Sequence, residues 1–269
     1  MSKVWVILLS MSVLTLNVFA GTTQKAGVMT RAVSYKAGGT TLKGYLAYTG
    51  KADHKRPGVL VVPEWWGLND YAKMRARMLA DLGYAAMAID MYGEGKQGNT
   101  PDEAGKLSGS VMKDPALLKA RFAAAMKELE KQPMVDTSRI AAIGYCFGGT
   151  VVLDAALMGF PLDGVVSFHG SLGGIVPAPK GAVKAKVLAC NGADDQFNPA
   201  KAIDGFKSEM TAAGVDYRLI NYPNSVHAFT NPAADSLGKK FNMPIAYNKA
   251  ADEKSWQDMK GFLSSILGK

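Results

Sequence analysis

Short apolar runs alternate along the chain with longer segments whose apolar residues recur every three or four positions. Two continuous apolar runs, at residues 58–62 and 85–89, are typical of strands in a parallel sheet, which is covered on both faces. Residues 69–82 carry apolar side chains on one stripe and are followed by Gly83, which predicts a helix and its end. The same patterns predict further strands at residues 31–36, 42–48, 139–144, 164–168, 185–190 and 217–221, and further helices at residues 115–130, 150–158, 199–213 and 253–267.

Repeated strand–helix units predict an α/β fold, with one mostly parallel central sheet and helices on both faces. The first two strands are joined by Gly38-Gly39 and are expected to form a hairpin. Residues 93–109 are rich in Gly and turn residues, which predicts a loop with at most one short helix. No Pro/Gly/Ser-rich linker divides residues 21–269, so we expect them to form a single domain.

The first 20 residues differ from the rest. A short start with one Lys is followed by an almost wholly apolar run at residues 4–16, and Val18-Phe19-Ala20 has small residues at the −3 and −1 positions of a cleavage site. This pattern predicts a signal peptide at residues 1–20 and an exported protein, periplasmic or secreted, that is soluble after cleavage. The apolar run is shorter than the roughly 20 residues that a membrane span needs. A retained anchor stays open because the basic start is weak.

Composition narrows the function classes. The chain has 269 residues, of which 48% are hydrophobic and 20% charged, and these proportions exclude a disordered or collagen-like protein. The formal net charge is +8, but the basic residues are scattered along the chain. A nucleic-acid-binding surface would cluster them, so we expect no nucleic-acid partner and a small molecule instead. The sequence does not determine the oligomeric state, and a monomer is the default expectation.

Cysteine and histidine are scarce. The two cysteines, Cys146 and Cys190, are too few for a disulfide scaffold, although an exported protein can pair them. Cys190 lies inside a predicted strand and is expected to be a core residue. Neither C-x-x-C nor H-E-x-x-H spacing occurs, so we predict no metal site and no cofactor.

The segment Gly144-Tyr-Cys146-Phe-Gly148 follows an apolar strand and precedes a helical pattern. This is the G-x-nucleophile-x-G elbow, with Cys in place of the more usual Ser. The nucleophile occupies a strained strand-to-helix turn, and the flanking positions are Gly because neighbouring backbone passes too close for a Cβ. The following helix N-terminus favours a thiolate. A buried structural cysteine in a glycine-containing turn is the alternative.

An acid and a histidine follow in the order that this elbow requires. Asp195 comes 49 residues after Cys146, at the end of a predicted strand, and His227 comes 32 residues later, just past another. Both therefore lie where open parallel sheets hold their sites. Asp194 is the alternative acid. Of the other histidines, His169 ends a strand at the same edge and either lines the pocket or has a hydrogen-bonded structural role, and His54 is expected on the surface.

With these motifs the sequence resembles the dienelactone hydrolase family of α/β-hydrolases from about residue 44 to the C-terminus. The resemblance rests on residues 61–69, 88–92, 144–149, 192–195 and 227–229. It implies an α/β-hydrolase fold and a triad of Cys146, Asp195 and His227. It also implies that Glu64 contacts the resting thiol and moves when substrate binds. The implied oxyanion hole uses the backbone N–H groups of Phe147 and Trp65.

One feature of that family is not matched. Dienelactone hydrolases hold a substrate carboxylate with two arginines, and residues 90–96 and 227–231 contain no Arg. Lys96 is present, but an ammonium lacks the bidentate fork of a guanidinium. We therefore expect an exported hydrolase that cleaves a small ester or lactone other than dienelactone. A non-catalytic binding protein on the same fold and a thiol redox protein using Cys146 and Cys190 are the alternatives.

Overall fold

The computed structural model describes residue 1 and residues 27–50, 54–173 and 177–268, so residues 2–20 of the predicted signal peptide lie outside its description. Its centre is an eight-stranded sheet with the order β1-β2-β4-β3-β5-β6-β7-β8. The first two strands run antiparallel and the other six are parallel to one another. The strands are β1 (Val28–Ala37), β2 (Thr40–Thr49), β3 (Arg56–Val62), β4 (Ala85–Ala88), β5 (Val135–Tyr145), β6 (Gly164–Phe168), β7 (Lys186–Gly192) and β8 (Tyr217–Tyr222).

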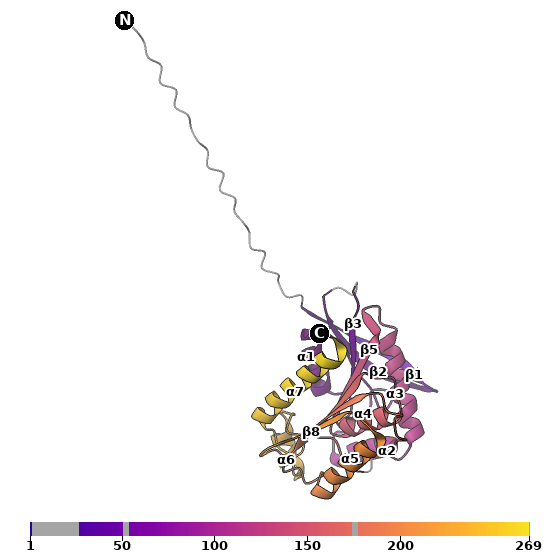
Figure 1. Cartoon of the computed structure of the whole chain (residues 1–269), viewed down its shortest axis with the longest axis vertical. Helices are drawn as coiled ribbons and strands as arrows, with labels where there is room; N and C mark the ends of the chain where they lie inside the picture. Colours follow the sequence, from indigo (N-terminus) through magenta and orange to yellow (C-terminus); the bar gives the residue numbers. More distant parts are fainter. Residues whose placement is uncertain (2–26, 51–53, 174–176, 269) are drawn as a thin grey trace.

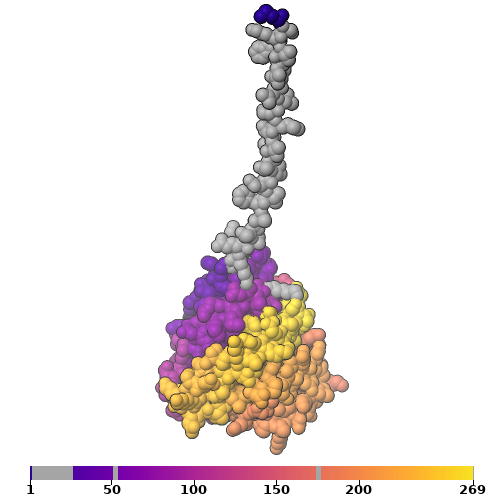
Figure 2. All heavy atoms as spheres, turned by 90° about the vertical axis from the view of Figure 1, so that its left-hand side faces the viewer, coloured from indigo at the N-terminus to yellow at the C-terminus, as the bar shows by residue number. Residues whose placement is uncertain are grey.

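Helices cover both faces of the sheet, as the sequence predicts (Figure 1). The helices are α1 (Asp70–Asp81), α2 (Pro101–Met112), α3 (Pro115–Glu130), α4 (Phe147–Leu157), α5 (Ala200–Ala213), α6 (Ala234–Phe241) and α7 (Lys249–Leu267). Helices α1 and α7 bury their apolar side chains against one face, and α3, α4 and α5 against the other. Figure 2 shows the yellow C-terminal segment lying across one surface between the purple and the orange segments.

Strand β3 shows why a continuous apolar run is required. All seven of its residues are buried. Val59 and Val61 belong to the core beneath α1 and α7, whereas Leu60 and Val62 belong to the core on the opposite face. Because successive side chains of a strand point to opposite faces, a strand covered on both sides needs apolar side chains at consecutive positions, as β3 has from Val59 to Val62. The prediction of a buried parallel strand is confirmed.

Two segments differ from the sequence prediction. The expected loop at residues 93–109 does contain one helix, α2, but this helix has 12 residues and continues past the predicted loop to Met112. Its start is capped: the Thr100 side chain accepts the N–H of Glu103, and Glu103 accepts the N–H of Asn99. This capping offsets the low helix propensity of the two glycines within α2. Helix α6 was not predicted either, because its eight residues are too few for a periodic apolar pattern. The helix is followed by Asn242, which caps it in the left-handed conformation.

The parallel register brings separate parts of the chain to one edge of the sheet. Val62 of β3 lies opposite Gly144 of β5, so Glu64 and Cys146 each lie two residues beyond a paired position. Tyr145 lies opposite Phe168 of β6, so His169 follows on the other side of Cys146. The carboxyl ends of parallel strands meet at one edge, and this edge carries the candidate site. None of the described helices combines the length and apolar character needed to cross a membrane.

Candidate active site

Cys146 occupies the turn between β5 and α4 and has a positive φ of 53°. Its neighbours allow no larger residue. A Cβ on Gly144 would lie 1.9 Å from the carbonyl oxygen of Gly148, and one on Gly148 would lie 2.3 Å from that of Val62. The steric explanation for glycine at both flanking positions of the elbow is therefore confirmed.

A continuous set of hydrogen bonds joins Cys146 to His227 and Asp195. Cys146 Sγ lies 3.1 Å from His227 Nε2, and His227 Nδ1 lies 2.9 Å from Asp195 Oδ2. Between the two acidic candidates, Asp195 is buried and contacts the histidine, whereas Asp194 is exposed. The three segments predicted to supply a nucleophile, a base and an acid therefore meet in the structure.

The carboxylate of Asp195 is itself oriented by its neighbours. Its Oδ1 accepts the backbone N–H of Phe197, and the Asn198 side chain lies 3.5 Å from Oδ2. Asn198 is fixed in turn by hydrogen bonds to Gly170 O and Asn191 Oδ1. Such a fixed carboxylate accepts the Nδ1 proton of the imidazole and orients the ring so that Nε2 faces the thiol.

The environment of His227 favours its protonated form. Burial on its own lowers the pKa of the imidazole, but the adjacent Cys146 and Asp195 outweigh burial and raise the pKa to about 10. His227 is therefore suited to take the proton of the Cys146 thiol, which is the task of a general base.

The backbone N–H groups of Trp65 and Phe147 are the predicted donors of an oxyanion hole. In the part of the chain that the structure describes, neither Trp65 N–H nor Phe147 N–H has a hydrogen-bond acceptor within the protein. Phe147 follows Cys146 at the start of α4, and Trp65 follows Glu64. The hydroxyl of Tyr92 donates to the carbonyl oxygen of Trp65 at 2.8 Å, which fixes this turn. Free, fixed N–H groups of this kind are the usual donors to a developing oxyanion.

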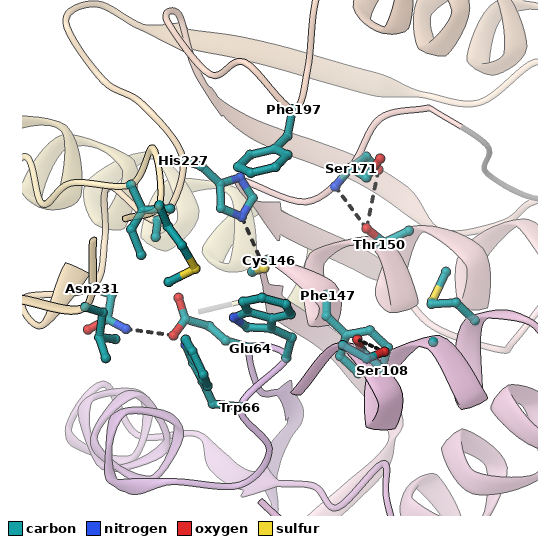
Figure 3. Close-up of a pocket in the computed structure, with 18 of the residues that line it drawn as sticks. Glu64, Trp66, Ser108, Cys146, Phe147, Thr150, Ser171, Phe197, His227 and Asn231 are labelled. Atoms are coloured by element: carbon teal, nitrogen blue, oxygen red, sulfur yellow. Dashed lines mark hydrogen bonds between the residues drawn. The ribbon is translucent and has the colours of Figure 1, made fainter. Parts of the chain in front are cut away.

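Glu64 is almost completely buried, and its Oε2 accepts a hydrogen bond of 2.7 Å from the Asn231 side chain. Burial raises the pKa of Glu64 to about 7, although the Asn231 hydrogen bond and the charges of His227 and Arg75 oppose the rise. The contact between Glu64 and the resting thiol stays a prediction, because here the carboxylate is directed to Asn231 and the sulfur to His227 (Figure 3).

The remaining candidates have structural surroundings. His169 is fully buried and hydrogen-bonded and does not line the cavity, so of its two predicted roles the structural one fits. Cys190 is buried in β7, where the Tyr222 hydroxyl lies 3.5 Å from its sulfur, and both cysteines are free. His54 is exposed. The described ranges contain no group of three or more His, Cys, Asp or Glu side chains that could hold a metal ion.

Cys146 and His227 face a cavity of about 460 Å³, within the usual range for small-molecule sites. Most of the cavity wall could not be predicted from the sequence, since part of it comes from α2, which was expected as a loop, and from α6, which was not predicted. No Lys or Arg is among the described residues that line it, and Lys96 is exposed elsewhere. Phe197 lies beside His227, with ring centroids 4.9 Å apart (Figure 3). The wall residues that the sequence did not single out include Trp66, Ser108, Met112, Thr150, Phe197, Leu237, Met243 and Ile245.

Residues 42–267 match the dienelactone hydrolase family. The chain belongs to this family. Among relatives, Protein usf of Aquifex pyrophilus is 30% identical over 226 residues, which cover 82% of this chain and 95% of that protein. A protein of Escherichia coli strain K12, provisionally named a carboxymethylenebutenolidase, is 27% identical over 240 residues, covering 86% of this chain and 85% of that one.

A solved structure described as a dienelactone hydrolase-like promiscuous phosphotriesterase from metagenomic libraries is 37% identical, with a TM-score of 0.81. The match covers 89% of this chain and 99% of that one. These likenesses confirm the α/β-hydrolase fold. Membership of the dienelactone hydrolase family places the chain among the hydrolases of carboxylic esters and lactones. Within that family, this chain has no Lys or Arg in its described cavity wall to bind a substrate carboxylate.

Proposed function

We propose that the protein hydrolyses small, uncharged esters or lactones through a covalent thioester on Cys146, and that it does so outside the cytoplasm. The observation that carries the proposal is the unbroken contact from Asp195 through His227 to the sulfur at the wall of the cavity. Nucleophilic catalysis by cysteine requires this order of acid, base and thiol.

The proposed reaction uses only these groups and water. His227 Nε2 accepts the proton of the thiol, and Sγ attacks the substrate carbonyl carbon while the N–H groups of Trp65 and Phe147 hold the oxyanion. As the intermediate collapses, the carbon–oxygen bond breaks and the alcohol leaves with the proton from His227. Water then gives a proton to His227 and attacks the thioester, and the acid departs as the thiol regains its proton.

The charge of the cavity supports an uncharged substrate. The ionisable side chains in its described wall are Glu64, Cys146 and His227, and none of these is a free cation. The Asn231 amide, which lies four residues past the catalytic histidine, binds Glu64 instead of a substrate carboxylate. Two tryptophans in contact, Trp65 and Trp66, supply apolar surface to the cavity wall, with ring centroids 5.0 Å apart.

A matched pair of chromogenic esters tests both parts of the proposal. p-Nitrophenyl butyrate and p-nitrophenyl hemisuccinate have acyl chains of similar length, but only the second carries a carboxylate. We expect butyrate to have at least a roughly tenfold higher kcat/KM, because a carboxylate would lose its solvation without gaining a Lys or Arg partner. An equal or higher value for hemisuccinate would overturn the assigned substrate charge. Mass spectrometry of acid-quenched enzyme should find one butyryl group on Cys146.

The same measurements separate the alternatives. A non-catalytic binding protein would release no p-nitrophenol above buffer, although it would bind the ester. A thiol redox protein would link Cys146 to Cys190 under mild oxidant, and the loss of two protons would show in its mass. Turnover that requires Cys146, without that link, would exclude both.

Uncharged phosphotriesters are a second candidate substrate class. The chain is 37% identical to the structure described as a promiscuous phosphotriesterase, and a cavity with no Lys or Arg in its described wall suits a neutral triester. Release of p-nitrophenol from paraoxon by wild type, and its loss in Cys146→Ala, would support this side activity. No release above buffer would exclude it.

The proposed export rests on the N-terminal pattern of residues 1–20. Expression of the full chain should yield extracytoplasmic protein that begins at Gly21. N-terminal sequencing that finds an intact Met1 or Ser2 in the exported fraction would favour a retained anchor.

A further inference from the structure

His169 is a buried group that the proposed reaction does not use. It follows β6 directly, is fully buried and has a positive φ of 41°, a conformation that costs energy in any residue with a side chain. Because β6 pairs with β5 in register, His169 lies beside the turn that carries Cys146. A strained, buried histidine next to a nucleophile requires a specific set of contacts to hold it.

The imidazole of His169 connects two separate parts of the site. Its Nδ1 accepts the backbone N–H of Cys146 at 3.1 Å, a donor that it shares with the carbonyl oxygen of Phe168 at 3.0 Å. Its Nε2 lies 2.7 Å from the hydroxyl oxygen of Thr230. Thr230 is three residues past His227, on the loop that carries the base. The ring of His169 also meets that of His227 edge-on, with centroids 5.2 Å apart.

The direction of both hydrogen bonds follows from the protonation of the ring. Burial, and then the positive charges of His227 and Arg75, lower the pKa of His169 well below its ordinary value, so the ring is neutral. Since Nδ1 accepts from a backbone N–H, the single ring proton is on Nε2 and is donated to Thr230. His169 thus accepts from the nucleophile turn and donates to the histidine loop.

Cys146, His169 and Thr230 thus form a hydrogen-bonded bridge, and its Thr230 end is also fixed. The Thr230 hydroxyl lies 2.6 Å from the Tyr71 hydroxyl. The backbone carbonyl oxygen of Thr230 accepts a 2.6 Å hydrogen bond from Arg75. Arg75 is a buried residue of α1 and forms a 2.6 Å ion pair with Asp252 of α7. Thr230 is therefore held against the main body of the protein by its backbone, and against His169 by its side chain.

We propose that His169 is a positioning residue that sets the nucleophile turn and the His227 loop at the separation the thiol–imidazole contact needs. The inference rests on the proposed function. The two segments come from different strand ends, and Cys146 and Ala228 both have positive φ angles, 53° and 60°. Strained turns of this kind persist only where the surroundings hold them. A displacement of about 1 Å between reacting groups can cost a hundredfold in rate.

The test breaks the bridge at its far end and leaves His169 in place. Thr230→Val keeps the shape of the side chain and removes the hydroxyl, whereas Thr230→Ser keeps the hydroxyl. With the fold verified and the active sites counted by titration, we expect Thr230→Val to lower kcat roughly 10- to 100-fold with little change in KM. Thr230→Ser should retain kcat within about threefold. Ser255→Ala, which removes a buried hydroxyl on α7, is the matched control.

A second readout does not depend on ester turnover. Alkylation of Cys146 by iodoacetamide near pH 7 reports the thiolate that His227 stabilises, so Thr230→Val should slow it by a similar factor. In a His227→Ala background, the Thr230→Val change should have no further effect. A kcat and an alkylation rate within twofold of wild type in Thr230→Val would overturn the positioning role. If wild type turns over no ester but the alkylation results hold, the proposed function fails and the bridge stands.

Discussion

Replacing Glu64 with Gln should stabilise the protein, and the gain should grow with pH. The carboxyl group lies two residues beyond β3 and is almost completely buried, and burial raises its pKa from an ordinary 4.5 to about 7. This rise in pKa corresponds to a free-energy difference of about 3 kcal/mol, because one pKa unit is worth about 1.4 kcal/mol. Gln has nearly the same shape and can still accept the hydrogen bond from Asn231.

The sign follows from the protons bound by each state. Well below pH 4.5 the carboxyl group is protonated in both folded and unfolded protein, so it has no effect on the free energy of unfolding. As the pH rises towards 7, the unfolded chain releases this proton while the folded protein retains it, so stability falls. Above pH 7 the folded protein holds a buried carboxylate, and the loss of stability reaches its full value.

Urea unfolding followed by circular dichroism, at pH 5, 6, 7 and 8, measures this effect. The advantage of Glu64→Gln over wild type should rise from about 1 kcal/mol at pH 5 to about 3 kcal/mol at pH 8. The control is Glu253→Gln, because that exposed carboxylate forms only a surface pair with Lys249, 3.8 Å away. The control should show no pH-dependent difference above about 0.5 kcal/mol. An advantage that is the same at pH 5 and pH 8, or a Gln variant that is less stable at pH 8, would refute a buried carboxyl group with a raised pKa.

Three other substitutions test the geometry of the site. Cys146→Ala should abolish ester hydrolysis, by at least about a thousandfold, while leaving the unfolding curve unchanged; activity within tenfold of wild type would remove this thiol from the mechanism. Asp195→Asn should lower kcat roughly a thousandfold, and the matched Asp194→Asn, at an exposed side chain, should change it by less than about twofold; equal losses would contradict the assignment of the acid. Gly148→Ala should reduce the free energy of unfolding by about 2 kcal/mol or more in denaturant titration, because its Cβ would lie 2.3 Å from the Val62 carbonyl oxygen. A loss below about 0.5 kcal/mol would show that the turn can relax.

Several features could be predicted because their cause is local. Helix α3 spans Pro115–Glu130, the predicted residues, since Pro at its start and one apolar stripe are properties of the segment itself. The elbow could be predicted equally well, because the two glycines around Cys146 reflect a steric requirement of one turn. The order of acid and histidine followed from the strand pattern, which places both at the same edge of the sheet.

Local patterns failed where a segment draws its stability from its surroundings. Helix α2 contains Gly105 and Gly109, and a composition argument assigns such a stretch to a loop. In the structure it is capped, and it packs beside α3 while lining the cavity. The short helix α6 gives too few residues for a periodic signal.

The sequence by itself determined the family, the α/β fold, and the three residue types and strand ends that the candidate chemistry needs. Only the tertiary structure decided which contacts those residues make. Asn231 binds Glu64 across a separation of 167 residues. His169 contacts Cys146, 23 residues before it, and Thr230, 61 residues after it. The absence of Lys and Arg from the described cavity wall is likewise a property of side chains gathered from α2, α4, α6 and the strand ends. The physical reason is that spacing along a chain sets the conformation of one segment, whereas the partner of a buried polar group is set by the packing of all segments together.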